Sequence, residues 1–186
     1  MSEDLGLISH PLSDIFPQPE SIEEWTSYCL SEDQLLEYQE KGFIHGIKVL
    51  NQDQIEVLRR ELSEMFVPEH EGREFFYEYH TNESSIPETV LFHALGAWRV
   101  RKAFHDILWN PAFVMPAYQL LGDGFRFFHD QIFCKPANHG SVVSWHQDFS
   151  YWTWTQPMHH LTCWIGLDDS NEENGCVHFV PGSQDR

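Results

Sequence analysis

The sequence places a histidine and a carboxylate two residues apart, within residues 144–148 (SWHQD). In extended backbone, positions i and i+2 face the same side, so the imidazole of His146 and the carboxylate of Asp148 converge and can hold one cation together. One imidazole, one carboxylate and a further imidazole form the facial triad of non-haem Fe(II) oxygenases, which leaves coordination positions open. An isolated pair of this kind is equally an ordinary hydrogen-bonded pair, so the surrounding sequence must decide.

Runs of alternating polarity surround this pair and predict strands. Residues 125–134, 160–167 and 176–180 alternate between apolar and polar side chains and are separated by turn residues, among them the acidic turn at 168–171. We therefore expect antiparallel strands in the second half of the chain, with the His146–Asp148 pair at the end of one of them.

The first half of the chain carries helical signals. Ser31 with Gln34, and Asn51 with Gln54, are capping boxes, in which each side chain satisfies a free backbone N–H. They predict one helix that ends before Gly42 and a second that begins after Asn51. The second helix should bury one stripe, formed by Ile55, Leu58, Leu62 and Met65.

The remaining segments complete an α+β prediction. Residues 43–50 are apolar and β-branched enough for a strand, whereas 66–90 read as a long excursion that can act as a lid. Residues 97–108 are helical in pattern, and Asn110-Pro111 ends that helix and starts another that closes at Gly122. Residues 1–30 are expected to form an irregular arm in front of a domain at 31–186.

Composition excludes several classes of protein. The 186 residues contain 11 Lys and Arg against 29 Asp and Glu, a net charge of −18 that disfavours binding to nucleic acid or to anionic membranes. Hydrophobic residues make up 41% of the chain, which is enough for a core, and no apolar stretch approaches the length of a spanning helix. Four scattered cysteines without CxxC spacing favour free thiols, and we expect a cytoplasmic protein.

Five motifs in order make the sequence similar to the phytanoyl-CoA dioxygenase family, and the resemblance covers about residues 31–186. The helix–strand–helix opening from Leu35 to Leu62 is also like that of the family. The motifs are residues 129–131 (HDQ) with 135–136 (KP), 145–148 (WHQD) with 151–152 (YW), 164–169 (WIGLDD), 173–176 (ENGC) and 180–183 (VPGS).

The resemblance implies a double-stranded β-helix, the cupin-type jelly roll, that uses Fe(II) and 2-oxoglutarate. It implies that His146 and Asp148 are iron ligands, and that Gln131, Gln147 and Trp164 contact 2-oxoglutarate. Taken alone, Trp164 is equally suited to an apolar core, and Gln131 to a bond with a neighbouring strand. Halide-transferring relatives have a small residue at the position of Asp148, so the family pattern favours hydroxylation.

Two members of the family's site have no match in these residues. They are the second histidine ligand and the basic residue, usually arginine, that pairs with the far carboxylate of 2-oxoglutarate. His159, His160 and His178 are local candidates for the ligand, but the first two lie beside a turn. Because the sequence predicts only about half of the eight strands of a jelly roll, we expect a domain truncated at its C-terminal end and inactive alone.

The leading hypothesis is therefore a dioxygenase that, as a complete chain, hydroxylates an unactivated C–H bond and releases succinate and CO2. Its partners would be O2 and a small, apolar metabolite or acyl substrate, as the aromatic residues at 151–154 suggest. The alternative hypothesis is a non-catalytic scaffold or regulatory member of the family that binds a partner through its open sheet edge. A metal-binding cupin without oxygenase activity explains His146 and Asp148, but not the three residues that match cosubstrate contacts.

Overall fold

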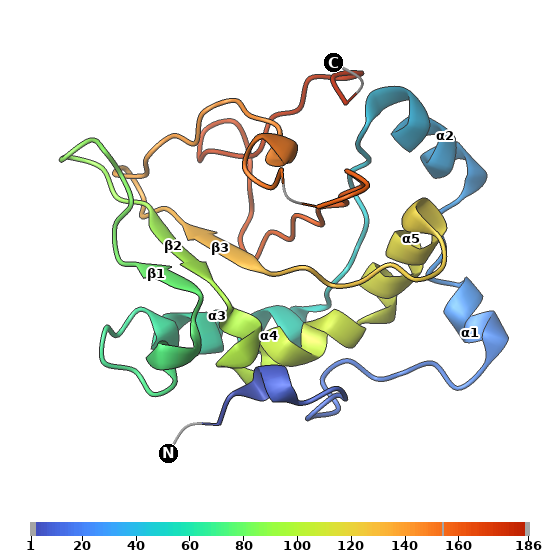
Figure 1. Ribbon diagram of the computed structural model, residues 1–186, viewed down its shortest axis with the longest axis horizontal. Coiled ribbons are helices and arrows are strands. Elements are labelled where there is room, and N and C mark those ends of the chain that lie inside the picture. Colours follow the sequence, from blue (N-terminus) through green and yellow to red (C-terminus); the bar gives the residue numbers. More distant parts are fainter. Residues whose placement is uncertain (1–2, 154, 185–186) are drawn as a thin grey trace.

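A computed structural model describes residues 3–153 and 155–184 and shows a small antiparallel sheet packed against helices (Figure 1). The sheet has the order β1-β2-β3, and β2 is antiparallel to both of its neighbours. This combination confirms the α+β class. The strands are β1 (Glu78–His80), β2 (Phe92–Leu95) and β3 (Gln131–Cys134), and the helices are α1 (Ile22–Thr26), α2 (Glu32–Lys41), α3 (Gln52–Met65), α4 (Lys102–Asp106) and α5 (Pro111–Leu121).

One face of the sheet packs on α3 and forms a hydrophobic core. Met65, at the end of α3, is fully buried in one cluster with Phe92, Ala94 and Ile132. The ring of Tyr79 packs against the same cluster, and its hydroxyl donates to the carbonyl of Met65 at 2.6 Å. Since neighbouring residues in a strand point to opposite faces, the residues between these core positions are left for the other face of the sheet.

The other face of the sheet is turned toward the segment that follows β3. In Figure 1, α3 and α4 lie below the sheet, and the chain from about 140 to 184 winds above it. The position of each side chain follows from the strand register, in which His80 pairs with His93, and His93 with Phe133. The residues on this face are Glu78, His80, His93, Leu95, Gln131 and Phe133.

The predicted helix signals are confirmed. Both capping boxes form, with Ser31 and Asn51 as the N-caps, and the first helix ends at Gly42 in a left-handed conformation with φ of 81°. Asn110 caps α5 by accepting the N–H of Ala112 at 3.1 Å. In the predicted stripe of α3, Leu58 and Met65 are fully buried, and Leu58 packs in a second core with Phe16, Leu50 and Ala103.

The strand predicted at 43–50 is wrong, because no other segment among the described residues pairs with it. These residues form an irregular link between α2 and α3. Their apolar side chains serve packing instead: Leu50 is buried in the second core, and Phe43 stacks on Phe179 with ring centroids 4.7 Å apart. The carbonyl of Val49 accepts a bond from the side chain of Asn110 at 2.9 Å.

The strands predicted at 160–167 and 176–180 are also absent, and the strand predicted at 125–134 is confined to β3. A strand exists only when a neighbour takes up its backbone hydrogen bonds, and within the described residues no such ladder runs along either segment. Residues 160–167 are held by side chains instead. Arg59 donates to the carbonyl of Leu167 at 2.7 Å and to the carboxylate of Asp168 at 2.6 Å.

Two aromatic residues of the segment 66–90, which was expected to be able to act as a lid, pack into the body of the protein. Phe76 and Tyr79 pack against the first core, and β1 lies in the sheet. In the described parts of the chain, no helix is both long enough and apolar enough to cross a membrane.

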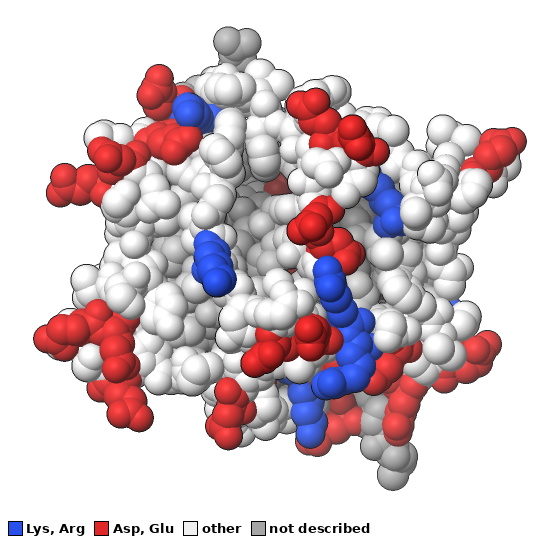
Figure 2. Space-filling view, turned by 180° about the vertical axis from the view of Figure 1, so that it is seen from behind, with Lys and Arg blue, Asp and Glu red and all other residues white. Residues whose placement is uncertain are grey.

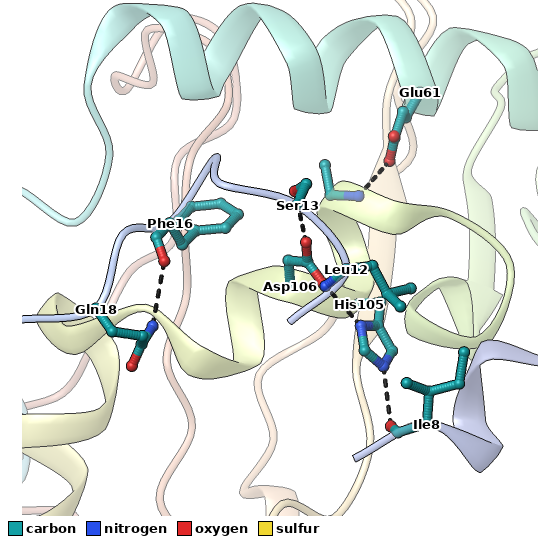
Figure 3. A network of polar contacts seen from close by, with 9 residues as sticks. Ile8, Leu12, Ser13, Phe16, Gln18, Glu61, His105 and Asp106 are labelled. Atoms are coloured by element: carbon teal, nitrogen blue, oxygen red, sulfur yellow. Dashed lines mark hydrogen bonds and ion pairs between the residues drawn. The ribbon is translucent and has the colours of Figure 1, made fainter. Parts of the chain in front are cut away.

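The N-terminal segment is attached to α4 by a buried polar network (Figure 3). The Asp106 carboxylate accepts the N–H of Leu12 at 2.8 Å and the hydroxyl of Ser13 at 2.5 Å. His105 joins this carboxylate through Nδ1 at 2.9 Å and bonds the carbonyl of Ile8 through Nε2 at 3.1 Å. His105 and Asp106 are fully buried, so their polar atoms depend on these partners.

Asp106→Ala should lower the free energy of unfolding by about 3 kcal/mol or more, because it leaves Nδ1 of the buried His105 and two donors of the arm without an acceptor. Urea denaturation measures the change. Asp14→Ala, on the same arm but exposed, is the matched control and should cost little. Equal costs for the two variants would show that the network does not hold the arm in place.

Candidate metal and cosubstrate site

His146 and Asp148 lie beside each other, as their spacing predicts, although not on one strand. Residues 141–147 are irregular, and Asp148 begins a short 3₁₀ helix, Asp148–Ser150. Nε2 of His146 lies 3.5 Å from Oδ1 of Asp148, and both side chains are about one-third exposed. The two groups therefore converge through a turn of the backbone rather than through the alternation of a strand.

A hydrogen bond fixes which nitrogen of His146 faces the carboxylate. Nδ1 lies 2.7 Å from the carbonyl of Ser144, so Nδ1 carries the proton and donates. In the neutral ring, the lone pair of Nε2 then faces Asp148. Donor atoms around an ion with bonds of about 2.1 Å sit about 3.0–3.4 Å apart, close to the separation seen here. With a proton on Nε2, the two side chains form instead the ordinary hydrogen-bonded pair that the sequence leaves open as the alternative.

The carboxylate of Asp148 is oriented from its other side. The hydroxyl of Thr162 donates to Oδ2 at 2.5 Å, which leaves Oδ1 directed at His146. The ring of Tyr151 stands edge-on to the imidazole, with centroids 5.5 Å apart. Outer hydrogen bonds of this kind orient the first ligands of a metal in known metal sites. Both members of the pair are thus held by a hydrogen bond from outside the pair, with Nε2 and Oδ1 3.5 Å apart.

Of the three residues expected to contact 2-oxoglutarate, the two glutamines have other partners in this structure. Gln131 lies on β3, and its amide nitrogen is 2.8 Å from Nε2 of His93 on β2. Gln147 donates to the carbonyl of Ser183 at 2.8 Å. Trp164 is 54% exposed, so it is not part of a closed core. Gln131 therefore makes the neighbouring-strand bond that the sequence left open as an alternative, whereas Trp164 stays accessible.

Two of the three local candidates for a third ligand are engaged elsewhere, and the third, His159, is exposed. Nε2 of His160 is hydrogen-bonded to the hydroxyl of Thr155, and Nε2 of His178 lies 3.6 Å from the thiol of Cys176. Among residues 3–153 and 155–184, the pair acquires no third metal-ligating group. Within the described residues, the candidate iron site therefore has two coordinating side chains, His146 and Asp148.

A different set of three coordinating groups lies on the sheet. Atoms of Glu78, His80 and His93 that can bind a metal all lie within 4.8 Å of one another. Sequence analysis missed this set because it assigned 66–90 to a loop. The signal that was present is the alternation Glu78-Tyr79-His80, which is an i, i+2 pair like that of His146 and Asp148.

Asp130, in the motif that contains Gln131, ties the start of β3 to the end of β2. Its carboxylate accepts the N–H of Gly96 at 2.8 Å and that of Trp98 at 2.9 Å. Burial raises the pKa of Asp130 above its usual range, and the two backbone N–H groups oppose that rise only in part. This clamp holds the strand that carries Gln131.

Charge is dispersed on the face seen in Figure 2. Acidic side chains are scattered over it, the few basic side chains are interleaved with them, and the central hollow is largely uncharged. That distribution is in line with the net charge of −18.

The family of the chain follows from a comparison with known families, in which the model of phytanoyl-CoA dioxygenase (PhyH) matches residues 38–186. The chain belongs to the phytanoyl-CoA dioxygenase family. The matched region contains the His146–Asp148 pair and the three residues predicted to contact the cosubstrate. The recognition made from the five motifs is thereby confirmed, and the mixed fold of helices and a small antiparallel sheet is consistent with this family.

Curated relatives of this phytanoyl-CoA dioxygenase family member include named oxygenases. The chain is 34% identical over 108 residues to L-proline trans-4-hydroxylase of Streptomyces griseoviridis, a match that covers 53% of this chain and 40% of the relative. It is 30% identical to ectoine dioxygenase of Halomonas elongata, with 83% and 46% covered. It is 28% identical to phytanoyl-CoA dioxygenase domain-containing protein 1 of Bos taurus, with 83% and 66% covered. The chain thus spans about 40–66% of the length of these relatives.

The raised pKa of Asp130 predicts a pH-dependent difference between the wild type and Asp130→Asn. A carboxyl whose pKa is higher in the folded than in the unfolded state stabilises the fold below its unfolded pKa, and this contribution is lost as pH rises through the folded pKa. The unfolding free energy of the wild type, minus that of the variant, should therefore fall as pH rises from about 4 toward 7. Urea titrations at several pH values measure this difference. A rise instead would show that the bonds from Gly96 and Trp98 outweigh burial.

Proposed function

We propose that the complete protein is an Fe(II)- and 2-oxoglutarate-dependent dioxygenase in which His146 and Asp148 are two of the iron ligands. The observation that carries this proposal is the orientation of the pair. A carbonyl behind His146 and a hydroxyl behind Asp148 hold Nε2 and Oδ1 at 3.5 Å from each other, in a member of a dioxygenase family. Imidazole and carboxylate are also the donor types of the facial triad that non-haem Fe(II) oxygenases use.

Iron with 2-oxoglutarate and O2 would supply the oxidising power to insert one oxygen atom into an unactivated C–H bond, with succinate and CO2 as co-products. The protein's own residues fix the positions of the two coordinating side chains. Ser144 keeps the proton of His146 on Nδ1, so that Nε2 is free to coordinate, and Thr162 holds the Asp148 carboxylate. A carboxylate at position 148 occupies the place that halide-transferring relatives leave open, which favours hydroxylation.

The remaining parts of the site are assigned by the same proposal. We place the third ligand and the basic partner of 2-oxoglutarate in the portion of the relatives that this chain does not cover. Further strands there would complete a jelly roll, and on this proposal residues 31–186 without them are inactive. Gln131, Gln147 and Trp164 would contact 2-oxoglutarate, and Gln131 would exchange its bond with His93 for one with the cosubstrate.

Apolar side chains beside the pair favour a small, apolar metabolite or an acyl group as substrate. Trp145 is 71% exposed and Tyr151 67% exposed, and both flank His146 in the sequence. Exposed apolar side chains that lie close together are typical of a surface to which a ligand binds. The substrates named for the relatives, proline and ectoine, are likewise small molecules.

Asp148→Ala in the complete protein should abolish substrate-dependent release of succinate, because one imidazole alone does not retain the metal. Succinate is quantified after incubation with Fe(II), 2-oxoglutarate and candidate substrates, and circular dichroism checks the fold. Asp169→Ala, an exposed aspartate in the following turn, is the matched control and should retain activity. Turnover like that of the wild type in Asp148→Ala would contradict the ligand assignment.

Trp164→Ala should raise the KM for 2-oxoglutarate by about tenfold, equivalent to about 1.4 kcal/mol of lost binding, while kcat changes less. Steady-state kinetics of the complete protein separate the two constants. Tyr118→Ala removes an exposed ring of α5 and should leave the KM unchanged. An unchanged KM in Trp164→Ala would mean that this ring does not contact the cosubstrate.

A further inference from the structure

The three coordinating groups on the sheet are brought together by strand geometry. Glu78 and His80 are two apart on β1 and therefore share one face. His80 is directly opposite His93 in the antiparallel register of β1 and β2. Side chains at directly opposite positions have Cβ atoms about 4.5–5.5 Å apart. One acidic and two imidazole side chains thus occupy adjacent positions on two paired strands.

The three coordinating atoms lie within 4.8 Å of one another, and one pair already has nearly the separation that a bound ion imposes. Oε2 of Glu78 lies 3.6 Å from Nε2 of His80, close to the separation of about 3.4 Å expected for two donors on a tetrahedral ion. The rings of His80 and His93 are stacked with centroids 5.9 Å apart. The side chains of Glu78 and His80 are about half exposed, so both have room to adjust around an ion.

His93 is the fixed member of the group. Its side chain is 7% exposed, and its ring stacks on Phe133 with centroids 4.7 Å apart. Oε2 of Glu83 lies 2.5 Å from Nδ1, and the amide nitrogen of Gln131 lies 2.8 Å from Nε2. Both ring nitrogens have a polar partner, so an ion on one of them displaces that partner while the other nitrogen keeps its own. A histidine backed by a carboxylate is the usual arrangement behind a coordinating imidazole.

We propose that Glu78, His80 and His93 bind a divalent transition-metal ion of the Zn²⁺ type, at a site separate from His146 and Asp148. Two imidazoles and one carboxylate are a common ligand set for Zn²⁺, with water in the remaining position. Because the side chains of Glu78 and His80 are about half exposed, the remaining coordination position is open to solvent. The net charge of −18 adds a general attraction for cations.

An ion at this site would join β1 to β2. β1 has three residues, and its pairing with β2 consists of three residue pairs. A metal held by both strands closes the loop between His80 and His93 and should stabilise the hairpin in the folded state. As long as His93 keeps its bond with Gln131, the ion would also restrain β3. None of these steps depends on the proposed oxygenase function.

The test is metal binding by the purified, metal-free protein. Zn²⁺ is titrated by calorimetry, and Co²⁺ is added in parallel because its visible absorption reports nitrogen and oxygen ligands. We expect one ion to bind, and His80→Ala and Glu78→Gln each to weaken binding about tenfold or more, equivalent to about 1.4 kcal/mol. His93→Ala should act in the same direction. Because His93 is buried, His93→Ala can fail to fold. In that case the variants of the two exposed residues, His80→Ala and Glu78→Gln, decide the test.

Two controls keep this site distinct from the proposed iron site. The double variant His146→Ala/Asp148→Ala should retain the Zn²⁺ affinity of the wild type, and His45→Ala removes an exposed histidine elsewhere and should also bind normally. Zn²⁺ should raise the melting temperature of the wild type but not that of His80→Ala. Absence of binding to the wild type, or loss of binding only in the double variant, would overturn the proposal. In either case, Glu83, His93 and Gln131 would form a structural network and nothing more.

Discussion

Packing of one face of the sheet on α3 determines which side chains are left for chemistry. Met65 of α3 packs against Phe92, Ala94 and Ile132 in one buried cluster. Because side chains alternate between the two faces of a strand, the intervening residues lie on the other face. That second face carries His93 and Gln131 as well as the exposed group on β1. The core and the polar face are thus two results of the same register.

Polar clamps keep this arrangement in place, one at the ends of β2 and β3 and others between the helices and the arm. Asp130 holds the chain between β2 and α4 through two backbone N–H groups, and Asp106 holds the N-terminal arm on α4. Glu61 of α3 accepts the N–H of Ala103 at 2.8 Å, although burial raises the pKa of Glu61. Helices, arm and sheet are therefore linked by carboxylates that accept backbone bonds.

Sequence reasoning predicted features that are local and missed those that depend on distant partners. Capping boxes act within four residues, so Ser31 and Asn51 identified two helix starts correctly. The spacing of His146 and Asp148 is equally local, and the pair converges even though the expected strand does not form. Strands at 160–167 and 176–180 require neighbours to take up their hydrogen bonds, and alternation alone cannot supply them. The approach of His80 to His93 likewise follows from register, which the sequence does not display.

The central claim is that His146 and Asp148 coordinate iron in the complete protein. The most direct measurement is a crystal structure of that protein, grown without oxygen in the presence of Fe(II) and 2-oxoglutarate, with anomalous scattering recorded at the iron edge. The account predicts an iron peak bonded to Nε2 of His146 and to a carboxylate oxygen of Asp148, at about 2.1 Å. Iron bound elsewhere, with His146 and Asp148 still joined only to each other, would contradict it.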